Sequence, residues 1–445
     1  MKERWLTVAA DAQAKRQERF RIWREAEHVP FSSPAAIAVY QEKVDMLVDA
    51  LSLEKKPKRI PVCPSPGFYP VQYGGISFRD AHYDNAKLAV VWEKYYDEFQ
   101  PDTYNTPGNL VSGKILDLLD YRLYKWAGAG IGNDKSFQYI EKEYMKADEY
   151  QDFIDDPTGY MLSVYFPRIA GNLAPLAALP LIPAQLEIPM ISAGVRPFGT
   201  PEFSGLLQKL TEAGQEVNDW FKAQTGVNLK IMGKGYPTLY GGFSKAPLDA
   251  IGDSMRGTVG VMMDIYKRPD LLLEACERMV PFMIKIGVAS TRASGNPLVF
   301  MPLHKGADSF MSQAQFDKFY WPSFRKVLIG LINDGCVPLL FAEGSYNKRL
   351  EAIRDLPKGS VIWWFDQTDM IKAKETLGDV ACIMGNVPLS LMCTGTPESV
   401  TGYCRNLIDK VGRDGGYIMS TGAGFEDVKA DNVRAMISFC KEYGA

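Results

Sequence analysis

"CVPLLFAEGSYNKRLEAIRDLP", residues 336–357, passes from a continuous apolar run through a short turn into a helix. The same pattern follows in "SVIWWFDQTD" with "MIKAKETLG", in "VACIMGNVP" with "PESVTGYCRNLIDKVG", and in "GYIMSTGAGF" with "NVRAMISFCKEYG". Upstream, "NPLVFMPLHKGAD" (296–308) precedes an amphipathic stretch over 312–335. Strands that are apolar throughout and alternate with helices indicate a parallel sheet covered on both faces.

The spacing of these units favours a closed barrel. The expected strand ends, His304, Glu343, Asp366, Asn386 and Thr421, follow one another at a mean interval of about 29 residues, close to the roughly 30 residues per unit of a (β/α)8 barrel. We therefore predict an α/β fold with a TIM-type (β/α)8 barrel over residues 59–445 and a helical N-terminal extension over residues 1–58. The four earlier strands are expected over 59–67, 101–108, 186–199 and 229–235.

A doubly wound sheet is the alternative fold. Such sheets often open with a strand, a GxGxxG turn and a helix, and the start of this chain carries no such motif. The sequence "GAGIG" (128–132) follows "LLDYRLYKWA", which is expected to be a helix. The barrel is therefore the better interpretation.

Composition narrows the class of protein. A formal net charge of −3 over 445 residues provides no basic face, so nucleic acid and anionic membranes are not expected partners. The longest apolar stretch, 173–191, is broken by prolines and a glutamate, and the charged N-terminus contains no signal-peptide core. Seven cysteines without a CxxC pair favour a reducing compartment, and we expect a cytoplasmic protein.

The strand ends carry the candidate functional residues. The catalytic mouth of a TIM barrel is built at the carboxyl ends of its strands, so His304, Glu343, Asp366 and Asn386 are expected to meet there. Glu343, His304 and Asp366 together form a ligand set for Zn²⁺. Alternatively, Glu343 acts as a general acid in apolar surroundings.

Structural roles remain open for several of these residues. His304 precedes "KG" and can simply stabilise a turn, and Asp366 can cap the next helix, although Asp369 is better placed for that. Asn386 can satisfy backbone groups in a tight turn. The aromatic, glycine-containing stretches 67–75 and 237–257 either form walls of a pocket for a flat ligand or are ordinary loops.

Several segments resemble the uroporphyrinogen decarboxylase superfamily, namely "SQAQFDKFYWPSFRKVL", "ACIMGNVP", "GTPESVTGYCRNLID" and "GGYIMSTGAGF". Weaker similarity continues upstream through "YKRPDLLLEACERM", "GVRPFGTPEF" and "RIPV", so it covers most of residues 59–441. The resemblance implies a (β/α)8 barrel. The superfamily includes the decarboxylase of haem synthesis and the methyltransferases that serve corrinoid proteins.

The sequence departs from both of these patterns. The first-strand region "PVCPSPGFYPVQYGG" (61–75) lacks the arginines with which the haem enzyme holds substrate carboxylates, and Asn105 stands where its catalytic aspartate is expected. The zinc-binding His-x-Cys and distant Cys of the thiol methyltransferases are replaced by Phe341-Ala342-Glu343 and by Ala423. Neither porphyrinogen decarboxylation nor a zinc-thiolate site is expected.

The resemblance instead implies an O-demethylase component that moves a methyl group from a methoxylated, aromatic substrate to the Co(I) of a separate corrinoid protein. Glu343 would protonate the ether oxygen or bind Zn²⁺, with His304 and Asp366 completing the site and Asn105, Tyr346 and Asn386 contacting substrate. The cobamide is expected on the partner, since this chain has only three histidines and no Asp-x-His-x-x-Gly motif. The resemblance also implies a homodimer. A lyase acting on an aromatic acid and a non-catalytic binding barrel are the alternatives.

Overall fold

A parallel six-stranded sheet forms the C-terminal half of the chain in the computed structural model, which describes residues 5–108, 110–180 and 187–444. The strands lie side by side in sequence order. They are β4 (Gly242–Phe243), β5 (Leu298–Leu303), β6 (Val337–Ala342), β7 (Ile362–Phe365), β8 (Cys382–Val387) and β9 (Tyr417–Thr421).

Two short extended segments close this sheet into a barrel. Val62 forms a parallel bridge with Met419 of β9, and Tyr104 forms one with Thr238, just before β4. Between the two segments, the amide of Asp102 donates a hydrogen bond of 2.9 Å to the carbonyl of Val62. These bridges add a first and a second strand position to the six-stranded sheet. The predicted (β/α)8 barrel is therefore confirmed.

The strands are apolar throughout because both of their faces are covered. All residues of β6, β7, β8 and β9 are buried. Inside the barrel lie side chains such as Phe341 and Trp364, whose ring centroids are 4.4 Å apart. Helices cover the outside of the barrel. Neither face of a strand is exposed to solvent, so its sequence is apolar throughout rather than alternating between apolar and polar residues.

Helices follow the strands in the order that the sequence predicts. Asp369 caps α18 and accepts hydrogen bonds from the amides of Ile371 and Lys372, which leaves Asp366 free of the capping role. The helices of this half are α12 (Pro247–Ser254), α13 (Gly257–Lys267), α14 (Pro269–Ser294), α15 (Gln313–Gln315), α16 (Trp321–Asn333), α17 (Leu350–Ile353), α18 (Met370–Leu377), α19 (Leu389–Thr394), α20 (Pro397–Leu407) and α21 (Ala430–Tyr443), with π-helical turns η5 (Phe316–Tyr320) and η6 (Ile408–Gly412).

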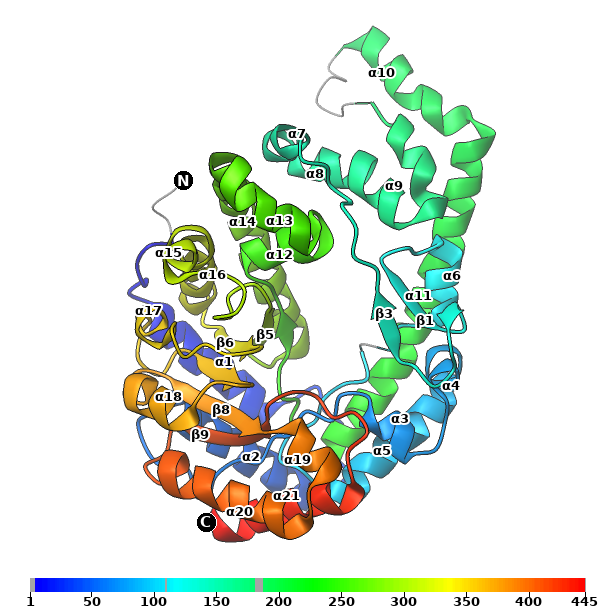
Figure 1. Ribbon diagram of the computed structural model, residues 1–445. Coiled ribbons are helices and arrows are strands. Elements are labelled where there is room, and N and C mark those ends of the chain that lie inside the picture. The colour runs from blue at the N-terminus through cyan, green and yellow to red at the C-terminus, as the bar shows by residue number, and fades with distance from the viewer. Residues whose placement is uncertain (1–4, 109, 181–186, 445) are drawn as a thin grey trace.

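A large insertion, residues 106–236, separates the second and third strand positions. In Figure 1 it rises beside the barrel mouth along the long helix α11 to α10 at the top. The insertion contains α6 (Gly113–Leu119), a small sheet of β1 (Tyr124–Ala127), β2 (Gly130–Ile131) and β3 (Phe137–Tyr139), and α7 (Tyr150–Asp155), α8 (Pro157–Tyr160), η1 (Met161–Tyr165), α9 (Phe166–Ile169), η2 (Gly171–Ala178), α10 (Ile188–Val195), η4 (Arg196–Gly199) and α11 (Pro201–Gly233).

Buried polar contacts attach this insertion to the barrel. The Arg256 guanidinium lies 2.6 Å from the Asp264 carboxylate and also donates a 2.6 Å hydrogen bond to the carbonyl of Met145 in the insertion. The Tyr150 hydroxyl of α7 donates to Asp264 at 2.9 Å. Because Arg256 and Asp264 are almost wholly buried, these contacts hold the insertion firmly over the mouth.

Three local predictions are wrong. Residues 188–195 are helix α10 rather than part of a strand over 186–199, whose first residue lies outside the described ranges. Residues 229–235 form the end and cap of the 33-residue helix α11, and the third strand position lies later, over 238–243. The stretch before "GAGIG" ends in strand β1 rather than in a helix.

The N-terminal helices pack against the barrel. Trp23 of α1 (Ala12–Glu25) and Tyr40 and Val44 of α2 (Pro34–Ser52) belong to the same apolar core as the barrel strands. Between the first two strand positions lie α3 (Tyr69–Tyr73), α4 (Phe78–Tyr83) and α5 (Asn85–Phe99). A domain boundary at residue 58 stays a prediction. Among the described residues, no helix is both long and apolar enough to span a bilayer.

Candidate active site

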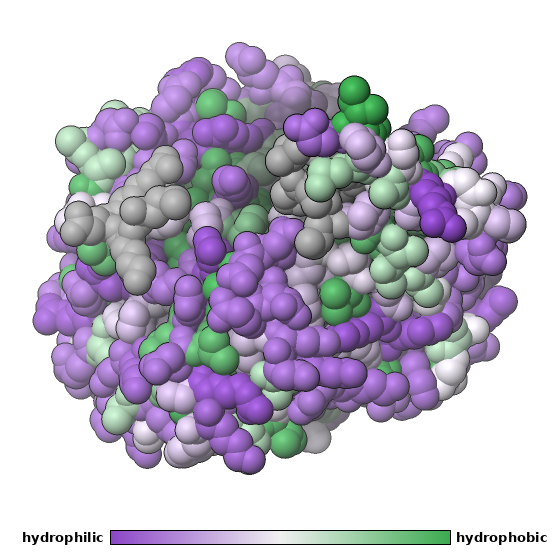
Figure 2. Space-filling model, turned by 90° about the horizontal axis from the view of Figure 1, so that it is seen from above, coloured by the Kyte–Doolittle hydropathy of each residue, from purple (hydrophilic) through white to green (hydrophobic). Residues whose placement is uncertain are grey.

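A cavity of about 670 Å³ opens at the carboxyl ends of the barrel strands and continues beneath the insertion. Seen from above, the surface is largely hydrophilic, and hydrophobic side chains gather around a central hollow (Figure 2). The cavity is lined mainly by aromatic and aliphatic side chains, with few polar groups: His82, Thr106, Val111, Leu116, Tyr121, Tyr124, Trp126, Phe137, Tyr240, Phe243, Phe300, Pro302, His304, Phe341 and Glu343. An apolar cavity with a few convergent polar groups is the usual form of a small-molecule site.

The barrel supplies an aromatic floor to this cavity. Tyr240 stacks on Phe300 with ring centroids 4.9 Å apart and planes 20° apart. Phe300 in turn stacks on Phe341 at 6.2 Å and 23°, and Phe341 packs against Trp364. These rings come from neighbouring strand positions and point into the barrel, so they present a flat surface to a planar ligand.

The insertion supplies the opposite wall. Tyr124 of β1 and Phe137 of β3 pack edge to face, with ring centroids 5.4 Å apart. The neighbouring Trp126 donates a hydrogen bond of 3.2 Å from its indole nitrogen to the Tyr83 hydroxyl. The cavity therefore lies between aromatic rings of the barrel and aromatic rings of the insertion.

One polar cluster at the cavity edge is the His304 imidazole, which lies between two carboxylates. His304 Nδ1 lies 2.6 Å from Asp253 Oδ2, and His304 Nε2 lies 3.3 Å from Glu343 Oε1. The strand register explains the second contact. Leu303 of β5 pairs with Ala342 of β6, so the residues that follow them, His304 and Glu343, become neighbours at the mouth.

Two lysines also contact the Asp253 carboxylate. Lys245 Nζ lies 2.5 Å from Asp253 Oδ2, and Lys305 Nζ lies 3.1 Å from Asp253 Oδ1. Asp249, one turn earlier on α12, is fully buried and accepts 2.7 Å hydrogen bonds from the Lys305 amide and the Tyr320 hydroxyl. Its burial, together with the charge of Asp253, raises the pKa of Asp249 to about 6.

These contacts make His304 a cation at neutral pH. Burial opposes the charge, but hydrogen bonds and charges from Asp253 and Glu343 outweigh it and raise the pKa of His304 to about 10. Burial likewise tends to raise the pKa of Asp253, whereas the His304 hydrogen bond and the nearby lysine charges hold that pKa well below its usual range. The arrangement is therefore an imidazolium that can donate a proton into an apolar cavity.

The donors present do not fit the zinc site predicted from the sequence. His304 Nε2 has one carboxylate beside it, Glu343, while His304 Nδ1 lies against Asp253. Asp366 instead accepts a 3.0 Å hydrogen bond from the Gly344 amide. Within residues 5–108, 110–180 and 187–444, no group of three His, Cys, Asp or Glu side chains is placed to hold a metal ion.

The structure brings together only two of the residues predicted from the sequence, His304 and Glu343. Asp366 lies near them, and its burial raises its pKa, with a further contribution from the charge of Glu343. Asn386 donates to the carbonyls of Asp366 and Thr368 and so holds a loop, while Tyr346 is fully buried behind the mouth. Neither Asn386 nor Tyr346 lines the cavity.

Asn105 ends the second strand position, next to the cavity-lining Thr106. The hydroxyl of the preceding residue, Tyr104, donates a hydrogen bond to Asn228 of α11, which lies outside the barrel. Because successive side chains of a strand point to opposite faces, the Asn105 side chain points into the barrel. Asn105 is 8% exposed, and its buried Oδ1 has no hydrogen-bond partner among the described residues. An unsatisfied buried amide oxygen at this place is consistent with the predicted contact to substrate.

Sequence reasoning missed Asp253, Lys245 and Lys305. Asp253 lies 51 positions before His304, in a segment expected to be a loop, and only the barrel brings α12 against β5. The available signal was the pair Asp249 and Asp253, which share one face of a helix at i,i+4 spacing in an otherwise apolar stretch.

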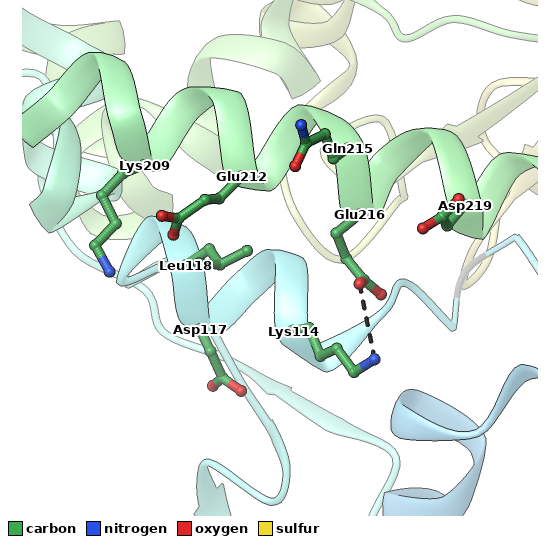
Figure 3. Close-up of a pocket in the computed structure, with 8 residues that line it drawn as sticks. All are labelled: Lys114, Asp117, Leu118, Lys209, Glu212, Gln215, Glu216 and Asp219. Carbon is green, nitrogen blue, oxygen red and sulfur yellow. Dashed lines mark ion pairs between the residues drawn. The ribbon is translucent and has the colours of Figure 1, made fainter.

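A second groove, between α6 and α11, has a different character (Figure 3). It is lined by Lys114, Asp117, Leu118, Lys209, Glu212, Gln215, Glu216 and Asp219. Lys114 Nζ lies 3.7 Å from Glu216 Oε2, and Glu216 also accepts a 2.8 Å hydrogen bond from the Ser112 hydroxyl. These contacts hold α6 on α11, and we assign the groove a packing role.

Comparisons with known proteins agree with this architecture. Residues 228–443 match the family model described as "Uroporphyrinogen decarboxylase (URO-D)". A curated uroporphyrinogen decarboxylase from Methylococcus capsulatus is 26% identical over 195 residues, or 43% of this chain, and the match spans about half (54%) of that relative's length. A solved structure of a methyltransferase from Methanosarcina mazei superposes with a TM-score of 0.59 over 92% of this chain and 99% of that one. At 15% identity this last similarity concerns the fold.

Proposed function

We propose that this chain, which belongs to the uroporphyrinogen decarboxylase superfamily, transfers a methyl group from a methoxylated aromatic compound to the Co(I) of a separate corrinoid protein. The observation that carries the proposal is a proton-donating imidazolium at the edge of a cavity formed by aromatic rings. The corrinoid is a second substrate, brought by the partner protein.

An aryl methyl ether needs an acid because phenolate must leave. When the bond between the ether oxygen and the methyl carbon breaks, its electron pair stays on the oxygen. That oxygen takes a proton from His304, and the methyl carbon forms its new bond with the electron pair of Co(I). The products are a phenol and the methylated corrinoid protein. General acid catalysis of this kind contributes about 10² to 10⁴ in rate.

The residues around His304 prepare it for this step. Asp253 at 2.6 Å fixes the ring through Nδ1 and so directs the proton on Nε2 toward Glu343 at the cavity edge. Glu343, 3.3 Å from Nε2, holds that proton in place and is positioned to return one after each turnover. We thus assign the proton transfer to His304 and a relay role to Glu343, with Asn105 contacting the substrate.

The imidazolium favours a methyl donor whose leaving oxygen becomes negatively charged. An uncharged ether that develops negative charge on its oxygen is complementary to the imidazolium. A methoxylated arene also matches the flat floor of rings.

The test is methyl transfer with purified components. The protein is mixed with a reduced corrinoid protein, or with free cob(I)alamin, and with a panel of methoxyarenes, and loss of the Co(I) absorbance and phenol formation are followed. We expect both signals to depend on this protein and to fall by about 10² or more in His304→Gln. His28→Gln, which changes an exposed histidine far from the mouth, serves as the matched control.

Two outcomes would overturn the proposal. If the isolated protein decarboxylates an aromatic acid without any corrinoid, the chain is a lyase. If His304→Gln and Glu343→Gln both transfer methyl groups as fast as His28→Gln, the cavity does not catalyse the reaction through these residues, and a binding barrel becomes the better interpretation.

A further inference from the structure

We infer that the cavity selects uncharged methoxyarenes and rejects methoxybenzoates and other rings that carry a carboxylate. The inference rests on the proposed function, since it takes the ring of a methoxylated compound as the occupant. It concerns a different property, the net charge of the ligand that the cavity binds. It follows from the contacts that the cationic side chains near the mouth already make.

The lining contains no lysine or arginine among the described residues. On the insertion side, away from the strand ends that carry His304 and Glu343, the wall is formed by Val111, Leu116 and Tyr121. A ring whose methyl ether lies at His304 extends toward this wall. A carboxylate on that part of the ring would lose its water without gaining a cation.

The two lysines near the mouth are engaged in contacts within the protein. Lys245 and Lys305 both bind Asp253, at 2.5 and 3.1 Å, and Lys305 also donates to the Thr258 hydroxyl at 3.0 Å. Their side chains are 18% and 11% exposed. Moving either ammonium to a substrate would break its contact with Asp253, whose side chain is 12% exposed.

The remaining cation, His304, lies between two acids. Its nitrogens face Asp253 and Glu343, and the Glu343 side chain is 43% exposed at the cavity edge. A second carboxylate would therefore meet the Glu343 charge. The ring faces of the floor and wall carry partial negative charge as well and disfavour an anion.

The other histidine of the lining offers no help to an anion. His82 Nδ1 lies 2.8 Å from the carbonyl oxygen of Val111, and Nε2 lies 3.2 Å from that of Ser136. Both ring nitrogens thus face backbone carbonyl oxygens. His82 joins α4 to the insertion and is not free to bind a carboxylate.

Uncharged polar substituents do find partners. The hydroxyls of Tyr121, Tyr124 and Tyr240 have no hydrogen-bond partner within the part of the chain that the structure describes. Burial raises the pKa of Tyr121 and of Tyr240 to about 12, so these groups stay protonated at neutral pH. They can donate to a phenol or to a second ether oxygen, but they do not neutralise a full charge.

The experiment compares binding of three ligands that share one ring. These are 2-methoxyphenol, 4-hydroxy-3-methoxybenzoate and 4-hydroxy-3-methoxybenzamide, the last being an uncharged analogue of the acid with nearly the same size. Dissociation constants are measured by calorimetry on the purified full chain at pH 7, without corrinoid. We expect the phenol and the amide to bind similarly and the acid to bind about 100-fold or more weakly.

A charge swap sharpens the test. Leu116→Arg places a guanidinium on the apolar wall and should recover at least about 10-fold of the acid's lost affinity, whereas Leu116→Gln, its uncharged control, should not. Acid binding within about 5-fold of the amide in the wild-type protein would overturn the inference and leave the proposed function standing. If neither the phenol nor the amide binds, the proposed function fails, and the inference fails with it.

Discussion

Replacing Asp253 by asparagine tests the central element of the site, the charged state of His304. The carboxylate of Asp253 lies 2.6 Å from His304 Nδ1, and its hydrogen bond is the largest contribution that raises the pKa of His304 to about 10. Asparagine keeps the size and a hydrogen-bond acceptor but removes the charge. The imidazole should therefore lose its proton at a much lower pH.

The magnitude follows from the two pKa values. Glu343 still attracts the proton, while Lys245 and Lys305 lose their carboxylate partner and repel it, and we take these effects as offsetting. With an ordinary pKa near 6.5, about a quarter of His304 is protonated at pH 7 and about 1% at pH 8.5. Wild-type His304 stays almost wholly protonated at both values. Methyl transfer in Asp253→Asn should thus fall about 4-fold at pH 7 and about 100-fold at pH 8.5.

The assay combines the pH profile with direct observation of the ring. Only three histidines, His28, His82 and His304, are present, so a protein with ¹³C-labelled histidine gives three Cε1 signals that His28→Gln and His82→Gln help to assign. The wild-type His304 signal should not move between pH 6 and 8.5, and in Asp253→Asn it should titrate near pH 6.5.

A matched loss at every pH would show that Asp253 acts only through packing. A wild-type His304 signal that titrates near pH 6.5 would refute the reasoning altogether, because the imidazolium would then not exist at neutral pH. The NMR measurement needs no methyl acceptor, so its result holds whatever the methyl donor is.

Three further predictions address stability and metal content. Folding raises the His304 pKa from about 6.5 to about 10. Protonated His304 therefore contributes its full stabilisation of the folded protein below pH 6.5, and this contribution is lost progressively as the pH rises to 10. The melting temperature should fall more steeply with pH in wild type than in His304→Gln. Arg256→Met leaves the buried carboxylate of Asp264 without its 2.6 Å partner and should lower the free energy of unfolding in urea by about 3–5 kcal/mol. The exposed control Lys15→Met should lower it by less than about 0.5 kcal/mol. Equal losses in the two variants would contradict this prediction. Mass spectrometry should find far less than one zinc per chain, and a full equivalent that disappears in Glu343→Ala would restore the metal site.

The sequence predicted the later barrel strands well for a physical reason. Strands β6 to β9 are buried on both faces, and β5 is buried except at Phe300 and Pro302. Each strand therefore appears as an apolar run followed by a polar residue at its end. The equal register of β5 and β6 then makes His304 and Glu343 neighbours without any loop geometry. This part of the site follows from the strand pattern alone.

The earlier half of the barrel was harder to predict because its strands are short. The first two strand positions are single bridges at Val62 and Tyr104, and β4 has two residues. Such segments leave little periodicity, and the apolar residues of α11 near 229–235 gave a stronger but misleading signal. Asp253 was missed for a different reason, since its contact with His304 depends on how α12 packs beside β5, which no local pattern encodes.

Different parts of the fold supply the proton donor and the wall that contacts the substrate ring. The proton donor and its partners come from the ends of β5 and β6 and from α12, where partly buried ion pairs fix their geometry. The wall that meets the far part of the ring comes from the insertion, through Leu116, Tyr124 and Phe137. Leu116 and Phe137 are uncharged apolar side chains, so apolar substitutions at these two positions should change which ring is accepted with little change in the His304 pKa. A superfamily barrel can acquire a new substrate in this way, because a change in the insertion leaves the acid at the mouth intact.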